Sequence, residues 1–249
     1  MLSVVPLGSA LVAGAFAITL ARQYVGRRKP HQLIWTVSMS LFALGAFLEF
    51  VMSFAVVTGP LFDLYYVSIG PETGLLGAGV VYLMRRRLGE YTLYVVGVLS
   101  ACLIVSVLIW PVNISGLVPG VAGPQMTYQQ WFQTSAVYGI YFAVSAFAAV
   151  PRDLTMILNS LGAVLVVGGG LFSFVVDRRR YYALLIAAGA LMNAIGGILL
   201  GVLGIPDVFF YFEFLGIILL FLGFLLSSRF VTRVTAPGQE RPAVPTATS

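Results

Sequence analysis

Three glutamates stand inside long apolar stretches of the chain: Glu49, Glu72 and Glu213. A charged side chain at the centre of a membrane helix costs about 2.5 to 3.5 kcal/mol on insertion scales, so acids there are candidate proton or cation sites. Two carboxyl groups close together in a low dielectric cannot both stay ionised, and one of them then holds a proton. The alternative is that each acid hydrogen-bonds a neighbouring side chain or carbonyl and only fixes helix packing.

The spacing of these acids suggests that they share one region. At 1.5 Å per residue, they lie about 8 to 13 Å below the outer ends of their predicted helices. Aligning Asp63 with Asp207 places Glu213 three positions from Glu72, and an i, i+3 offset keeps both on roughly one helical face. Pro71, directly before Glu72, has no N–H, so the carbonyl one turn earlier loses its helical hydrogen bond. Membrane helices tolerate such a missing bond where the helix lines a cavity.

Three further residues are weaker candidates for solute binding. Asn193 stands in an apolar run, where an interhelical hydrogen bond is the favoured interpretation. Tyr66 and Tyr211 lie near predicted outer ends, where their rings could stack on a solute, although aromatic belts at membrane interfaces use the same residues.

The elements that must position these residues are membrane-spanning helices. Of 249 residues, 59% are hydrophobic and 9% are charged, whereas soluble domains carry about a quarter charged residues. The composition excludes a disordered chain, a disulfide-stapled secreted domain and a nucleic-acid-binding module. One cysteine, one histidine and one lysine make a metal cluster, a histidine triad and a retinal Schiff base unfavourable. We therefore expect no catalytic residues, metal or cofactor, and the sequence favours a role other than catalysis without settling it.

The basic residues decide how often the chain crosses the membrane. Eight apolar runs are long enough to span, but eight crossings would divide the basic residues almost evenly between the two sides. If residues 131–150 do not cross, thirteen of the fourteen Lys and Arg fall on one side and only Arg152 on the other. The positive-inside rule then predicts seven spans, with the N-terminus outside and the C-terminus in the cytoplasm. Residues 131–150 are expected to be interfacial or re-entrant.

The order of features also predicts an internal repeat. Residues 5–84 and 154–227 both show an apolar helix, a basic cluster, a second helix, an Asp-containing turn and an aromatic-led helix. The predicted fold is all-α, a polytopic membrane protein of seven helices in a 3+1+3 arrangement with parallel repeats. Its parts are a first three-helix bundle, a linker helix with the outer segment, a second three-helix bundle and a disordered cytoplasmic tail. In that order they cover residues 1–90, 91–153, 154–231 and 232–249.

Two resemblances follow from these patterns. The topology is similar to that of SWEET-type sugar transporters and other PQ-loop proteins, but the only Pro-Gln pair is Pro124-Gln125 in the outer loop, so the likeness is architectural. The runs from Pro30 to Phe50 and from Leu64 to Arg87 resemble uncharacterised prokaryotic multi-spanning membrane proteins, which implies no activity.

Together these patterns predict a small-solute membrane transporter, a uniporter or a proton-linked carrier, with an acidic site between two repeats. The alternative is a non-transporting complex subunit or receptor-like bundle that binds a protein or lipid through its outer loop. Expected partners are membrane lipid and a small solute or cation, with no nucleic acid. Thirteen arginines against one lysine favour a prokaryotic plasma membrane. The sequence does not identify the substrate, the coupling ion or the oligomeric state.

Overall fold

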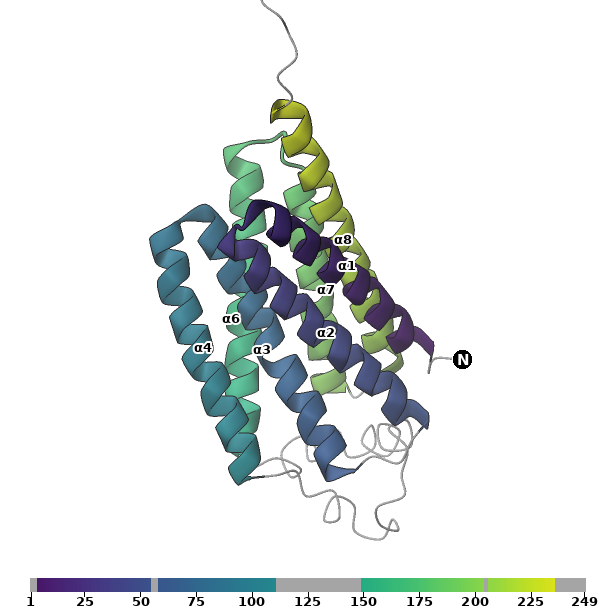
Figure 1. The fold of residues 1–249 in the computed structure, drawn as a ribbon. Coiled ribbons are helices and arrows are strands. Elements are labelled where there is room, and N and C mark those ends of the chain that lie inside the picture. The colour runs from purple at the N-terminus through teal and green to yellow at the C-terminus, as the bar shows by residue number, and fades with distance from the viewer. Residues whose placement is uncertain (1–3, 55–57, 111–148, 204–205, 236–249) are drawn as a thin grey trace, which may run out of the picture.

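The computed structural model describes residues 4–54, 58–110, 149–203 and 206–235. Seven helices occupy these ranges, and the described residues contain no strand (Figure 1). All seven are long and apolar enough to cross a membrane, which confirms the predicted all-α, seven-span fold. They are α1 (Val5–Arg27), α2 (Pro30–Phe54), α3 (Gly59–Met84), α4 (Arg86–Ile109), α6 (Ala149–Val176), α7 (Tyr182–Leu203) and α8 (Pro206–Thr235).

Two of the predicted segments fall partly or wholly outside these ranges. The segment 131–150, expected not to cross, lies outside the described residues except for its last two, which begin α6. The tail was expected from residue 232, but α8 continues to Thr235. The rest of the tail is outside the described residues.

Proline marks the beginnings of four helices. It lies within the first two positions of α1 and α3 and is the first residue of α2 and α8. Its fixed φ suits the first turn, and its missing N–H has no partner there in any case. At the other end of α1, Arg28 adopts a left-handed conformation with φ 49° and donates its N–H to the Tyr24 carbonyl at 2.7 Å. After this cap the chain reverses direction and enters α2.

Six of the helices pack as a closed ring. Each contacts its neighbours in the order α1, α2, α3, α6, α7 and α8, and α8 returns to α1. Helix α4 packs outside the ring against α3 and α6. The ring joins two triplets, α1–α3 and α6–α8, through the α3·α6 and α1·α8 interfaces.

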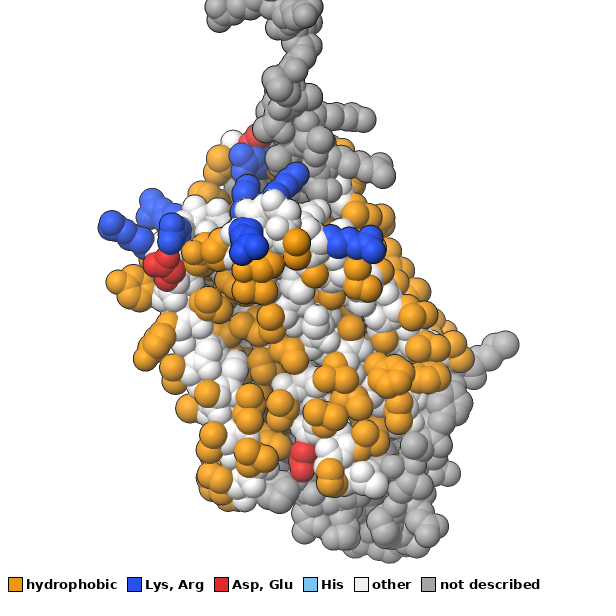
Figure 2. Space-filling model, viewed as in Figure 1, with side chains coloured by type: hydrophobic (Ala, Val, Ile, Leu, Met, Phe, Trp, Pro, Cys, Tyr) orange, Lys and Arg blue, Asp and Glu red, His pale blue; other side chains and the backbone are white. Residues whose placement is uncertain are grey.

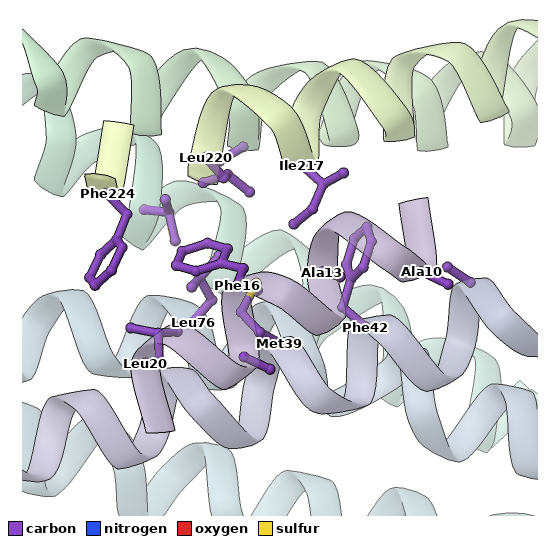
Figure 3. Packing of buried hydrophobic residues seen from close by; sticks show 14 residues of the cluster. Ala10, Ala13, Phe16, Leu20, Met39, Phe42, Leu76, Ile217, Leu220 and Phe224 are labelled. Carbon is purple, nitrogen blue, oxygen red and sulfur yellow. The ribbon is translucent and has the colours of Figure 1, made fainter. Parts of the chain in front are cut away.

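A shared apolar core fills the ring. It takes residues from all six helices, including Phe16, Met39, Val166, Ala190 and Ile217 (Figure 3). Because lipid is as apolar as these side chains, packing rather than water exclusion selects such contacts in a membrane. The outward faces remain apolar too, as Figure 2 shows for one side of the molecule.

Glycines bring α3 and α6 into backbone contact. A Cβ on Gly162 would collide with the Thr73 carbonyl, and one on Gly77 would lie 2.9 Å from Gly162 Cα. This is the close approach that small residues permit between membrane helices. The two backbones are therefore so close that α3 and α6 have almost no room to shift against each other unless they first move apart.

The basic residues gather at one end of the bundle. Exposed arginines and Lys29 occupy the α1–α2, α3–α4 and α6–α7 turns, which lie at the same end because successive helices alternate in direction (Figure 2). We call this the basic end. Arg152, near the start of α6, lies at the opposite end. The chain is an integral membrane protein whose helices contact lipid.

Candidate functional site

Two of the three predicted glutamates meet inside the bundle. Glu49, near the end of α2, is 2% exposed, and Glu213, in the second turn of α8, is 7% exposed. Their carboxyl groups lie within hydrogen-bonding reach of each other. They are 164 positions apart in sequence and belong to different triplets. The contact therefore crosses the interior of the ring, because α2 and α8 are not neighbours in it.

Glu72 completes a group that we call the acidic cluster: Glu49, Glu72 and Glu213. It interacts electrostatically with both other carboxyl groups. Unlike them it is partly exposed, and it lies about 20 Å along α3 from Gly59, close to the middle of the helix. This is deeper than the sequence suggested, because α3 begins five residues before the expected Leu64. Glu72 is the accessible and central member of the cluster.

Hydroxyl groups of α3 hold two of these carboxyls. Tyr65 donates its O–H to Glu49 Oε1 at 2.6 Å, and Thr73 donates to Glu72 Oε1, also at 2.6 Å. Tyr65 is buried at 6% exposure. Hydrogen bonds to carboxylates are the strong class, so these donors fix the positions of the two acids.

Helix α2 is tied to α3 at the level of Glu72 and one turn closer to the basic end. Ser38 donates to the Glu72 main-chain carbonyl at 2.7 Å, and the Trp35 indole donates to the Leu76 carbonyl at 3.1 Å. These two carbonyls are one turn apart, so Ser38 and Trp35 of α2 bind the same face of α3. The backbone that carries Glu72 is thus fixed against α2.

Small residues of α1 allow α8 to come close enough for Glu213 to enter the ring. A Cβ on Gly8 would lie 3.0 Å from the Phe214 ring, next to Glu213. Ser9, Ala10 and Ala13 follow on α1, and all three are buried. A larger side chain at Gly8 would require the Phe214 ring to shift.

Two tyrosines of the predicted site lie elsewhere. Tyr66 is buried, but its hydroxyl lies beside Thr155 of α6 on another face of α3. Tyr211 is 54% exposed on α8. The tyrosine that contacts the acids is Tyr65, whose position near a predicted outer helix end suggested either stacking on a solute or, as the favoured interpretation, a place in the interfacial aromatic belt. Its signal was the i, i+7 spacing to Glu72, which places both on one face of α3.

Asn193 lies close to the acidic cluster. Its side-chain oxygen packs directly against Gly216 of α8, one turn beyond Glu213. The same oxygen is buried and accepts no hydrogen bond from the described residues. The interhelical hydrogen bond favoured from the sequence is therefore not made by this atom.

An aromatic layer closes the ring interior toward the basic end. It consists of Phe16, Trp35, Phe221 and Phe224. The Phe16 ring lies 5.0 Å from that of Phe221 and 5.1 Å from that of Phe224, and Trp35 meets Phe224 edge to face at 6.2 Å. Such pairs add about 0.5 to 1.5 kcal/mol beyond their burial. The acidic cluster lies on the other side of this layer.

The ion pairs Arg86–Glu90, Arg152–Asp153 and Arg180–Asp177 all lie at helix ends. Within the part of the chain that the structure describes, Glu72 and Glu213 form no ion pair with Lys or Arg. In that part, no three His, Cys, Asp or Glu side chains are arranged to hold a metal ion.

The fold and its apolar surface thus define a seven-helix integral membrane protein with acids in its interior. No family model, no curated protein and no solved structure matches the chain.

Proposed function

We propose that the protein is a proton-linked transporter of a small solute, with the acidic cluster as its coupling site. The observation that carries this proposal is the contact between Glu49 of α2 and Glu213 of α8 inside the membrane-spanning bundle, with Glu72 of α3 in electrostatic range of both. Ionisable groups at such depth are expensive and mark proton relays or substrate pathways in membrane proteins.

The contact between Glu49 and Glu213 gives the site its proton chemistry. Two ionised carboxyl groups in hydrogen-bonding reach repel each other, whereas one shared proton turns the contact into a strong hydrogen bond. Glu72, partly exposed and coupled to both, is the group through which protons reach the buried pair.

The position of this contact links the proton to helix movement. Glu49 belongs to a triplet in which Ser38 and Trp35 lock α2 to α3, and Glu213 belongs to the other triplet. When the shared proton leaves or a solute takes its place, the force between the triplets changes. The internal repeat predicted from the sequence is compatible with this scheme, because a twofold axis relating the triplets would exchange the α3·α6 and α1·α8 interfaces. Transporters of this plan bind solute between their halves.

The basic end gives the orientation. By the positive-inside rule it faces the cytoplasm of a prokaryotic plasma membrane, with the N-terminus outside. The aromatic layer then closes the cytoplasmic side, and the acidic cluster lies on the side toward the exterior.

The experiment uses the full chain in liposomes with a proton gradient across the membrane. Accumulation of sugars, amino acids and simple amines is measured by mass spectrometry for wild type, Glu72→Gln and Glu90→Gln. Glu90 is the matched control, an acid on α4 that is exposed and paired with Arg86. We expect at least one solute to follow the gradient in wild type and Glu90→Gln but not in Glu72→Gln. Solute accumulation that depends neither on the proton gradient nor on Glu72 would contradict the proposal.

A further inference from the structure

The outward face of α4 carries polar and apolar side chains in a definite order. Helix α4 packs against α3 and α6 outside the ring (Figure 1) and is the least buried of the seven spans. Four exposed residues follow one another along this face at intervals of three or four positions, which keeps them on one side of the helix. We call them the α4 strip: Arg87, Tyr91, Tyr94 and Val98.

Arginine charge lies without a counter-charge where the α4 strip begins, at the basic end. Arg86 is paired with Glu90 at 3.0 Å. Arg85 and Arg87 form no ion pair with the residues that the structure describes. Both are exposed, and Arg85 is the single residue between α3 and α4. Because a guanidinium group can bind a phosphate through two parallel hydrogen bonds, these two arginines suit a phosphate group at the membrane surface.

The chemistry of the α4 strip changes in the same order as that of a phospholipid. Tyr91 and Tyr94 lie about 6 and 10 Å from Arg87 along the helix, and both rings are exposed. Their hydroxyls can donate hydrogen bonds to the ester groups below a phosphate. Val98 lies about 16 Å from Arg87, and nothing lies within 4 Å of a Cβ on the neighbouring Gly97. This part of the strip leaves room for an acyl chain.

We propose that the α4 strip binds an anionic phospholipid. The phosphate binds Arg85 and Arg87. The ester groups accept hydrogen bonds from Tyr91, and an acyl chain runs along Val98. A zwitterionic lipid would bring its own ammonium group to the arginines. The strip lies outside the ring, so this inference does not depend on the proposed transport function.

Charge also decides between a lipid and a second copy of the chain as the occupant. Two copies in one membrane are related by an axis along the membrane normal, which brings the same surface patch of each copy together at the same depth. The unpaired Arg85 and Arg87 of one copy would then face those of the other. A phospholipid phosphate instead supplies the missing negative charge.

Native mass spectrometry of the purified full chain in a nonionic detergent measures lipid binding and oligomeric state together. The probes are phosphatidylglycerol, phosphatidylcholine with the same acyl chains and, as the soluble phosphate, glycerol 3-phosphate. We expect the first phosphatidylglycerol to bind at least about tenfold more tightly than phosphatidylcholine. Glycerol 3-phosphate should not displace it, because the acyl chain contributes to binding.

Two double variants separate the α4 strip from the general charge of the basic end. Arg85→Gln with Arg87→Gln should weaken phosphatidylglycerol binding about 10- to 30-fold, because each arginine near an anionic lipid contributes about fivefold. Arg27→Gln with Arg28→Gln removes the same charge at the α1–α2 turn and should keep the affinity. All four arginines are exposed, so both double variants should melt like wild type without added lipid.

A tyrosine pair tests the ester contact. Tyr91→Phe should weaken phosphatidylglycerol binding about two- to tenfold through the loss of one hydrogen bond. Tyr181→Phe is the matched control, because Tyr181 is also exposed at the basic end but lies outside the α4 strip. It should leave the affinity unchanged.

Five outcomes would overturn the inference. Equal losses in the two double variants would show that only the total charge matters, and equal affinity for phosphatidylcholine would show that the phosphate charge is not recognised. Displacement by glycerol 3-phosphate would indicate a site for a soluble phosphate. Full affinity in Tyr91→Phe would remove the ester contact. A lipid-free dimer that takes up no phosphatidylglycerol would show that a second copy covers this face.

Discussion

The hydrogen bond from Tyr65 to Glu49 is the interaction of the site whose loss can be predicted most closely. Tyr65→Phe removes one oxygen atom and keeps the ring, which contacts Phe62 with 5.6 Å between centroids. The donor and acceptor atoms are 2.6 Å apart, and both side chains are at least nine-tenths buried. No water replaces the donor easily at such a position, so Glu49 Oε1 loses its hydroxyl partner.

The magnitude follows from the class of hydrogen bond. Bonds to charged groups contribute about 1.5 to 3 kcal/mol, and a buried acceptor without its donor costs about as much. We expect Tyr65→Phe to lower the free energy of unfolding by about 1.5 to 3 kcal/mol, a change of about 10- to 150-fold in the unfolding equilibrium constant.

Reversible unfolding in mixed micelles, followed by circular dichroism, measures this change. Tyr94→Phe is the matched control, because Tyr94 is 75% exposed on the outer face of α4. Its effect should stay within about 0.5 kcal/mol. If Tyr65→Phe were no more destabilising than Tyr94→Phe, Tyr65 would not hold Glu49 and the described geometry of the site would be wrong.

Two further predictions concern the helix interfaces and use the same unfolding assay. Gly162→Ala places a methyl group against the Thr73 carbonyl and should cost about 1 to 3 kcal/mol as overpacking. Gly168→Ala, on the same helix with nothing within 4 Å of its Cβ position, should be neutral or stabilising, and equal costs at the two glycines would refute the close α3·α6 contact. Trp35→Phe removes the donor to the Leu76 carbonyl and should cost at least about 1 kcal/mol. A variant as stable as wild type would show that Trp35 does not tie α2 to α3.

The sequence predicted the helices well, because a membrane imposes their length and composition. Apolar runs of about 20 residues and basic turns between them were enough for seven spans. Their ends were less certain. Gly59-Pro60 begins α3 five residues before the apolar run suggested, and this shift alone moves Glu72 from the predicted outer half to the middle of its helix.

The contacts within the site were harder to predict. In a soluble helix the apolar face identifies the core, but a membrane helix is apolar toward lipid and toward its neighbours. Periodicity therefore could not show that Glu49 and Glu213, on helices that are not neighbours in the ring, would meet. The high cost of a buried acid did single out the three glutamates that the structure brings together. No comparable cost separates Tyr65 from Tyr66, and only the i, i+7 spacing to Glu72 distinguishes them.

The proposed coupling depends on Glu49 and Glu213 acting as one unit. A double-mutant cycle on the free energy of unfolding, with Glu49→Gln, Glu213→Gln and the double variant, measures this directly. The direct contact predicts a coupling free energy between about 0.5 and 3 kcal/mol, whereas Glu49→Gln combined with Glu90→Gln should be additive. Additivity of Glu49→Gln and Glu213→Gln within about 0.3 kcal/mol would contradict the account, because the two acids would then not share a site.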